Sequence, residues 1–390
     1  MIDPVALLQD LIRCESITPK EGGAITLLEK LLKAGGFECH RLKFSDKGTP
    51  DVENLYARWG KGKPHLCFAG HTDVVPPGDR SLWTCDPFGG EIRDGQVWGR
   101  GACDMKGGVA AFAAAALNFI GKNGKDYPGS ISLLITGDEE GPSVNGTKKV
   151  LEWMDKRGEK IDFCIVGEPS SREALGDMMK IGRRGSLTGK ITVDGVQGHV
   201  AWPQLADNPI PKLLTLLKTL DDLELDQGTA LFQPSNLEIV NIDVGNTAEN
   251  VIPGAARAAF NVRFNDLHSG ASLEEKLRGA MDALRIPYKM TMRISGESFY
   301  TPPGAHSEML QKAVRKVTGL TPELSTTGGT SDARFIRQYC PVIEFGLPGK
   351  LLHKTDERVL VKDVHTLADI YAEIIGEYPR MTHSPSRGIQ

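Results

Sequence analysis

The sequence predicts an α/β protein: a mostly parallel mixed sheet sandwiched by helices, with a second domain inserted into it. Short apolar runs with strand character alternate with helical segments up to residue 182, and a related pattern returns after residue 297. The length of 390 residues also exceeds the size of one typical core. We therefore expect a first domain of residues 1–182 and 297–390, and an inserted domain of residues 183–296.

The first domain alternates strands and helices, which is typical of a largely parallel sheet covered on both faces. Helices are expected at residues 5–14, 22–35, 109–117, 144–156, 305–318, 330–339 and 364–375. Strands are expected at residues 37–44, 54–59, 64–69, 130–136, 161–166 and 341–345. Residues 45–51 are expected to form a polar loop, and Asp94-Gly95 a hairpin turn.

The segment 183–296 has a different order of elements. Strands are expected at 186–193, 236–244, 256–264 and 287–294, and helices at 208–220 and 272–284. This order, β-α-β-β-α-β, is typical of a ferredoxin-like unit with an antiparallel sheet.

The composition argues against several kinds of partner. The chain is 40% hydrophobic and 25% charged, and its net charge of -4 offers no attraction for nucleic acid or an anionic membrane. No apolar run approaches the roughly 20 residues that a membrane span needs, and the first residues lack a signal-peptide pattern. The seven cysteines are scattered and form no Cys-x-x-Cys pair. We therefore expect a cytoplasmic protein with no nucleic-acid or membrane partner.

The stretch Gly70-His71-Thr72-Asp73 is the first candidate for chemistry. It follows the apolar strand 64–69, so His71 lies at the carboxyl end of a strand, where open α/β sheets bind ligands. The carboxylate of Asp73 is expected to hold one ring nitrogen of His71. The other nitrogen is then free to bind a metal ion.

Four more residues with metal-binding side chains stand at the ends of later elements: Asp104, Glu140, Glu168 and His353. With His71 they supply two imidazoles and three carboxylates, a mixed set that suits Zn²⁺ and tolerates Co²⁺ or Mn²⁺. One tetrahedral zinc ion does not need five protein ligands, whereas two ions that share a carboxylate do. With Asp104 as the bridge, each ion has Asp104, one histidine and one glutamate.

Glu139 stands directly before Glu140 after a predicted strand. Adjacent side chains leave a strand end in different directions, so only one of the two carboxylates reaches a given ion. The other is free to take a proton from the attacking water and pass it to the leaving nitrogen. Glu139 is therefore the candidate general base and acid.

Five motifs together resemble the di-zinc aminoacylase and carboxypeptidase family, in the order found there and across the whole chain. They are His71-Thr72-Asp73, Gly101-Ala102-Cys103-Asp104-Met105-Lys106-Gly107-Gly108, Asp138-Glu139-Glu140-Gly141, Gly167-Glu168-Pro169 and His353-Lys354. Residues 182–189, 198–203 and 325–335 are most similar to the branch of the family that hydrolyses N-succinyl-LL-2,6-diaminopimelate.

The resemblance implies a role for each matching residue. His71 and Glu168 would hold one zinc ion, Glu140 and His353 the other, with Asp104 as the bridge. Asp73 would act behind His71 and Glu139 as the proton acceptor, and the Asp104-Met105 peptide would be cis. His199 would reach the active site of a partner subunit and help to bind the substrate carbonyl, so the inserted domain would be a dimerisation and lid domain of a homodimer.

The implied substrate carries three carboxylates, which need cations and backbone donors because an unpaired buried carboxylate is costly. Arg183, Arg184 and Arg263 are candidates, because arginine grips carboxylates bidentately. Gly329 and Thr330 are expected to open a helix whose N–H groups cradle another carboxylate. Asn250 matches a motif that lines the substrate cleft in the family.

Two other functions remain open. A sibling amidase, such as an acetylornithine deacetylase, an aminoacylase or a dipeptidase, shares the metal motifs and differs in the arginine and Gly-Gly-Thr segments. A non-catalytic binding protein on the same fold is disfavoured by the presence of all five ligands and Glu139.

Overall fold

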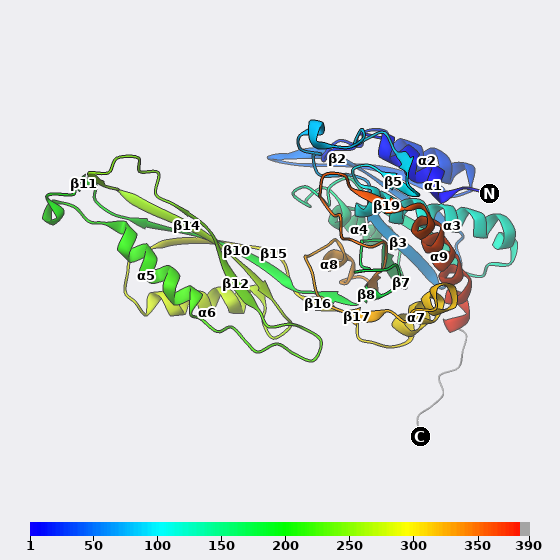
Figure 1. Cartoon of the computed structure of the whole chain (residues 1–390). Helices are drawn as coiled ribbons and strands as arrows, with labels where there is room; N and C mark the ends of the chain where they lie inside the picture. The colour runs from blue at the N-terminus through cyan, green and yellow to red at the C-terminus, as the bar shows by residue number, and fades with distance from the viewer. Residues whose placement is uncertain (383–390) are drawn as a thin grey trace, which may run out of the picture. The chain divides into compact units, whose positions relative to one another are not determined.

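The computed structural model describes residues 1–382 and divides the chain into two compact units (Figure 1). The first unit comprises residues 1–181, 301–325 and the described part of the chain from Ser331 onward. The second comprises residues 182–300 and 326–330. The segment 183–296, expected as the insert, thus lies inside the second unit, together with a short piece of the later chain.

The first unit is built on a mixed sheet, as the sequence predicts, and this sheet has eight strands. Its order is β1-β2-β6-β3-β7-β18-β8-β17, and the pairs β6–β3, β3–β7, β7–β18 and β8–β17 are parallel. The strands are β1 (Glu38–Asp46), β2 (Thr49–Trp59), β3 (His65–His71), β6 (Ser130–Thr136), β7 (Phe163–Val166), β8 (Met178–Lys180), β17 (Glu323–Ser325) and β18 (Val342–Glu344). A smaller sheet joins β4 (Glu91–Arg93), β5 (Gln96–Trp98) and β19 (Arg358–Leu360).

Helices cover both faces of the large sheet. On one face α1 (Pro4–Arg13), α3 (Gly107–Asn123), α7 (Ala305–Thr318) and α9 (Val361–Thr382) contact one another, and α2 (Ala24–Ala34) packs on β1 and β2. On the other face α4 (Thr147–Lys156) contacts β2, β6 and α8 (Ala333–Ile336). Tyr56 of β2 meets Trp153 of α4 with ring centroids 5.9 Å apart.

The alanine-rich helix α3 forms the centre of the core. Its small side chains let it lie close to the sheet, and Phe112 stacks on Phe68 of β3 with ring centroids 4.4 Å apart. Contrary to the sequence prediction, the stretch Ala102–Asn123 is long and apolar enough to cross a membrane, but 78% of its apolar window is buried inside the protein. These apolar residues therefore serve the core of the first unit.

Several element boundaries differ from the prediction. The expected loop 45–51 is wrong, because Gly48 at φ 82 permits a tight turn and β2 already begins at Thr49 opposite Asp46. The helix expected at 330–339 is only α8, Ala333–Ile336. The three-residue strands β8, β17 and β19 were not predicted, since pairing with distant neighbours stabilises them rather than local propensity.

The second unit has the predicted order of elements: β10 (Gly185–Asp194), α5 (Pro209–Asp221), β12 (Asn236–Asp243), β14 (Ala255–Phe264), α6 (Gly270–Asp282) and β15 (Lys289–Gly296). The antiparallel sheet has the order β12-β14-β10-β15. Alternate residues of β14, such as Phe260 and Val262, are buried in one core with Leu217 of α5 and Leu277 of α6. The opposite face of the sheet is polar.

Gly108 provides a test of the close packing of α3 against the large sheet of the first unit. A Cβ at Gly108 would lie 2.5 Å from the backbone oxygen of Gly167, so Gly108→Ala must push the helix from the strand end that bears Glu168. We expect it to destabilise the protein by about 1–3 kcal/mol, measured by chemical denaturation. Gly121→Ala is the matched control in the same helix, because nothing lies within 4 Å of its added Cβ; it should stabilise by about 0.5–1 kcal/mol. Equal effects of the two substitutions would contradict the packing constraint.

Candidate metal centre

Parallel pairing brings the predicted ligands to one edge of the large sheet. His71 at the end of β3 lies opposite Thr136 at the end of β6, and Ala69 of β3 lies opposite Val166 at the end of β7. The chain after β6 carries Glu139 and Glu140, and the chain after β7 carries Glu168. Carboxyl ends of parallel strands meet at one edge, so these side chains converge there.

Asp104 lies at the centre of the cluster, where the chain enters α3 through a non-helical turn with φ -120 and ψ 92. Its Oδ1 lies 3.3 Å from Nε2 of His71, and its Oδ2 lies 3.1 Å from Nε2 of His353. Nε2 of His71 also lies 3.7 Å from Glu168, and Nε2 of His353 lies 2.8 Å from Glu140. The two oxygens of Asp104 thus face two different histidine–glutamate pairs.

Three groups of potential ligands have their ligand atoms within 4.8 Å of one another: His71, Asp104 and Glu168; Asp104, Glu140 and His353; and His71, Glu139 and Glu140. The first two are the sets that the sequence predicts. Nε2 of His71 and Oδ1 of Asp104 are buried and have no hydrogen-bond partner among the described residues. Buried polar atoms are normally paired, and the donor set suits zinc, so the residues fit two divalent cations.

The pKa shifts of the two histidines in the cluster also favour a bound cation. Hydrogen bonds to Asp104 and Glu140 raise the pKa of His353 to about 10. Burial acts to lower the pKa of His71, but the nearby carboxylates of Asp104 and Glu168 outweigh it and hold that pKa well above its ordinary value. The converging carboxylates thus favour positive charge at the centre of the cluster, which a divalent cation supplies.

Asp73 holds His71 in a way that differs from the prediction. Nδ1 of His71 hydrogen-bonds the backbone oxygen of Asp73 at 2.8 Å, whereas the carboxylate of Asp73 lies 3.6 Å from Nδ1. That carboxylate instead accepts from the backbone N–H groups of Glu139 at 3.3 Å and Glu140 at 3.1 Å. The main chain thus fixes the ring, and the side chain shapes the turn that bears the two glutamates.

Glu139 lies beside the cluster, within ligand distance of His71 and Glu140. Burial, followed by the negative charge of Glu168, raises the pKa of the Glu139 carboxyl well above its ordinary value. A carboxylate with a raised pKa is suited to hold a proton near neutral pH.

The Asp104-Met105 peptide is cis, as the family resemblance implies.

Two residues behind the cluster were missed by sequence reasoning. The side chains of Arg100 and Glu357 form an ion pair of 2.7 Å and are 3% and 0% exposed. Arg100 stands four residues before Asp104, and Glu357 stands four residues after His353. A charged residue close to a metal-ligand motif was the only signal, and such residues are usually solvated.

The remaining predicted site residues lie in the second unit. The short strands β11 (Gly198–His199) and β13 (Val251–Ile252) pair, so His199 lies next to the segment that carries Asn250. Arg263 lies close enough for its charge to lower the pKa of Arg184, after the larger effect of burial, whereas Arg183 donates to the backbone oxygen of Thr327 at 3.2 Å.

The prediction that Gly329 and Thr330 open a helix is wrong. Helix α8 begins only at Ala333. Ser331 donates its hydroxyl to Glu344 of β18, which fixes the chain before the helix through a tertiary contact. The hydroxyl of Thr330 is buried without a hydrogen-bond partner among the described residues. It remains a candidate hydrogen-bonding group for a ligand, without the help of a helix N-terminus.

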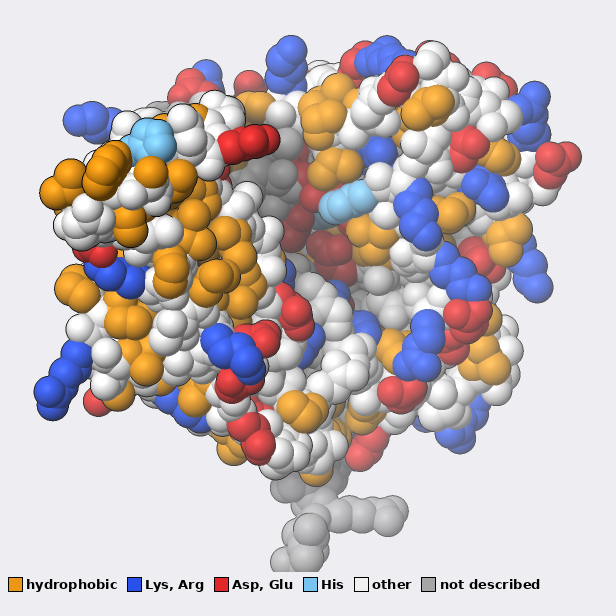
Figure 2. Space-filling model, turned by 60° about the vertical axis from the view of Figure 1, so that its left-hand side comes forward, with side chains coloured by type: hydrophobic (Ala, Val, Ile, Leu, Met, Phe, Trp, Pro, Cys, Tyr) orange, Lys and Arg blue, Asp and Glu red, His pale blue; other side chains and the backbone are white. Residues whose placement is uncertain are grey.

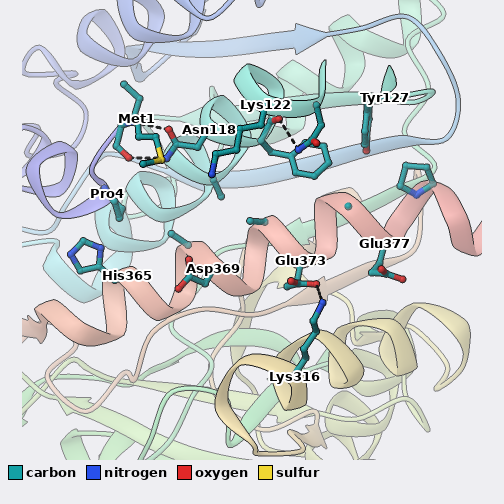
Figure 3. Close-up of a pocket in the computed structure, with 18 of the residues that line it drawn as sticks. Met1, Pro4, Asn118, Lys122, Tyr127, Lys316, His365, Asp369, Glu373 and Glu377 are labelled. Atoms are coloured by element: carbon teal, nitrogen blue, oxygen red, sulfur yellow. Dashed lines mark hydrogen bonds and ion pairs between the residues drawn. The ribbon is translucent and has the colours of Figure 1, made fainter. Parts of the chain in front are cut away.

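A separate groove of about 1080 Å³ lies in the first unit (Figure 3). The N-terminal residues, the end of α3 and α9 line it, with Asn118, Lys122, His365 and Glu373 among the labelled side chains. None of the cluster residues lines this groove. Its acidic and basic side chains are mixed, and Lys316 already pairs with Glu373. The groove is therefore not the site of the chemistry.

Comparison with known proteins identifies the family. Residues 67–377 match the family model described as peptidase family M20/M25/M40. The chain belongs to this family. A succinyl-diaminopimelate desuccinylase from Parvibaculum lavamentivorans is 58% identical over 380 residues, which cover 96% of this chain and 95% of that protein. Family membership makes this chain a metal-dependent hydrolase and confirms the predicted resemblance.

Solved structures of the M20 family share the fold. A metallo-carboxypeptidase from Sulfolobus solfataricus has a TM-score of 0.82 at 18% identity, over 97% of this chain and 100% of its own. A dinuclear metal-binding peptidase from Bacillus subtilis has a TM-score of 0.70 at 15% identity, over 95% of this chain and 96% of its own. At these identities the likeness concerns the fold.

Proposed function

We propose that the chain hydrolyses N-succinyl-LL-2,6-diaminopimelate to succinate and LL-2,6-diaminopimelate, a step toward lysine and peptidoglycan precursors. The observation that carries this substrate is the high identity, over nearly the full length, to a protein named for that reaction. The reaction class rests on the five-ligand cluster with Glu139 beside it. The seven cysteines are all free, which supports a location in the cytoplasm.

Two zinc ions are the proposed cofactor, with Co²⁺ as a substitute. His71, Asp104 and Glu168 would hold one ion, and Asp104, Glu140 and His353 the other. When bound, the ions supply Lewis acidity to the scissile carbonyl and to the attacking water. The buried, unpartnered atoms of His71 and Asp104 support this assignment, as does the dinuclear description of the Bacillus subtilis neighbour.

Glu139 is the proposed proton carrier. Its carboxylate takes a proton from the water that attacks the amide carbon, and it returns that proton to the nitrogen as the amide bond breaks. Asp73 supports this step by accepting hydrogen bonds from the backbone of both Glu139 and Glu140, which fixes the turn between them. The products are a carboxylate and an amine, so the atoms and protons balance.

His199 is proposed to bind the substrate carbonyl in a homodimer. Its Nδ1 accepts a hydrogen bond from the backbone N–H of Ala201 at 3.0 Å, so in the neutral ring Nε2 carries the hydrogen and is a donor. A donor of this kind stabilises the negative charge that develops on the oxygen of the amide. The ring is exposed and makes no other hydrogen bond in the described part of the chain.

An apolar surface on the second unit supports dimer formation through that unit. Large hydrophobic side chains within six residues of His199 are strongly exposed: Val196, Val200, Trp202 and Leu205. Val240 and Ile242 of β12 are exposed as well. Hydrophobic side chains gather over the part of the surface at the left of the view in Figure 2. Contiguous exposed apolar area of this kind marks an interaction surface.

Arg184 and Arg263 are the proposed carboxylate-binding groups, with Arg183, Asn250, Gly329 and Thr330 as further candidates. Nη1 of Arg184 donates to Asn236 at 2.9 Å, and Nε of Arg184 is buried without a partner among the described residues. Burial lowers the pKa of both Arg184 and Arg263, and no carboxylate pairs with either within residues 1–382. Two neighbouring guanidinium groups without a counter-charge favour an anion.

The alternative is a sibling amidase, which would share the metal cluster. Zinc-reloaded apo-protein should release succinate from N-succinyl-LL-2,6-diaminopimelate and act weakly on N-acetylornithine. Arg263→Met should raise KM for the succinyl compound by about 10-fold or more, because it removes a charge-assisted hydrogen bond. Arg257→Met is the control, since Arg257 lies exposed on the same strand and face. Preference for the acetyl compound would move the chain to the sibling class.

Glu139→Gln should bind two metal ions with parental affinity, yet lower kcat by about 10²–10⁴-fold because the proton acceptor is lost. Metal content and steady-state hydrolysis measure the two effects separately. Glu140→Gln is the comparison variant, because Glu140 is adjacent in sequence and lies 2.8 Å from His353. Loss of the Glu140 carboxylate should weaken metal binding as well as turnover. Retained turnover in the Glu139 variant would exclude its role in proton transfer.

Trp202→Glu should shift the protein from dimer to monomer in sedimentation, because it places a charge on the exposed apolar surface. The monomer should also lose activity, as it would lack a partner's His199. Leu82→Glu changes an equally exposed apolar residue of the first unit and should leave the dimer intact. A parent chain that sediments as a monomer would refute this part of the proposal.

A further inference from the structure

The buried pair of Arg100 and Glu357 has no part in the proposed reaction. Both side chains lie in the first unit, behind the metal cluster, and are almost completely removed from water. Burying two charges costs several kcal/mol, which the attraction between them repays only with good geometry and further hydrogen bonds. The hydrogen bonds that surround this pair show what it connects.

Glu357 holds the turn that presents Asp104. Its Oε2 accepts from Nη1 of Arg100 at 2.7 Å and from the backbone N–H of Gly101 at 2.9 Å. Its Oε1 accepts from the backbone N–H groups of Cys103 at 2.9 Å and Asp104 at 3.2 Å. These N–H groups precede the regular part of α3, so the carboxylate takes the place of helical partners and fixes the backbone at Asp104.

Arg100 holds the loop that presents His353. Its Nη1 donates to the backbone oxygen of Lys354 at 3.2 Å, and its Nη2 donates to that of His353 at 3.3 Å. The guanidinium also lies over the ring of Trp83, 5.2 Å from its centroid. His353 has φ 59, an uncommon conformation for a residue other than glycine, which its surroundings must impose.

We infer that Arg100 and Glu357 are positioning residues that fix His353 relative to Asp104 and thereby set the affinity of one metal position, formed by Asp104, Glu140 and His353. The other position, formed by His71, Asp104 and Glu168, takes no ligand from the His353 loop. The pair therefore acts unequally on the two ions. This inference rests on the two-metal part of the proposed function and not on the identity of the substrate.

The test is titration of the full-length apo-protein with Co²⁺, followed by visible absorption and calorimetry. Two binding events are expected for the parent. In Glu357→Gln and Arg100→Lys one of the two events should lose about 10–100-fold in affinity, the range found when groups behind metal ligands are changed. In Arg100→Lys the other event should keep its affinity and its spectrum; in Glu357→Gln it should weaken less than the first, because Asp104 belongs to both positions. Arg100→Lys retains the charge beside Glu357 but cannot reach both carbonyl oxygens.

Glu159→Gln is the control, because Glu159 pairs with Arg58 elsewhere in the first unit. It should leave both binding events unchanged. If Glu357→Gln does not fold, as judged by circular dichroism of the apo-protein, Arg100→Lys decides the question. Equal weakening of both events, or no change in folded variants, would overturn the inference. A parent that binds one ion would overturn it together with the two-metal proposal, whereas failure to release succinate would affect only the substrate assignment.

Discussion

The convergence of three carboxylates on two imidazoles is the constraint on which the rest of the structure depends. All ligand atoms of each group lie within 4.8 Å of one another at the edge of a sheet. Like charges at such distances repel in a poorly solvated site. Asp104 relieves part of this repulsion by turning one oxygen to each histidine, yet polar atoms of His71 and Asp104 stay without hydrogen bonds in the described chain. The cluster is therefore suited to hold cations, which would neutralise its carboxylates and bind these unpaired atoms.

The surrounding architecture keeps these ligands in place. The parallel pairing of β3, β6 and β7 ends these strands at the same edge of the sheet. His71, the turn that carries Glu139 and Glu140, and Glu168 therefore lie together at that edge. The close approach of Gly108 to Gly167 lets the start of α3 reach the same edge, which places Asp104 beside the histidine and glutamate side chains there. The last candidate ligand, His353, comes from a loop far along the chain, and the Arg100–Glu357 pair joins that loop to the Asp104 turn.

The sequence predicted the parts of this site that depend on local signals. Strand runs followed by a histidine or a glutamate are visible within about ten residues and indicated His71, Glu140 and Glu168 as candidate ligands; the family motifs supported Asp104 and His353 as the others. The predicted contact between the Asp73 carboxylate and His71 was wrong, and the contacts of Arg100 and Glu357 were missed, because all of them depend on tertiary structure. Whether the carboxylate or the carbonyl of Asp73 meets His71 depends on the turn geometry, and Arg100 and Glu357 are separated by 257 positions.

Under the proposed function, substrate selectivity would depend on groups other than the candidate metal ligands, because a metal centre promotes hydrolysis of any amide that reaches it. Two neighbouring guanidinium groups without a counter-charge, Arg184 and Arg263, penalise a ligand that leaves them unpaired. A succinyl group ends in a carboxylate and an acetyl group in a methyl, so only the former neutralises these cations. Sites built to pair a polar group reject analogues that lack it far more strongly than apolar pockets reject a missing methylene. Under the proposed function, discrimination between acyl groups would therefore arise from the cost of leaving Arg184 and Arg263 unpaired.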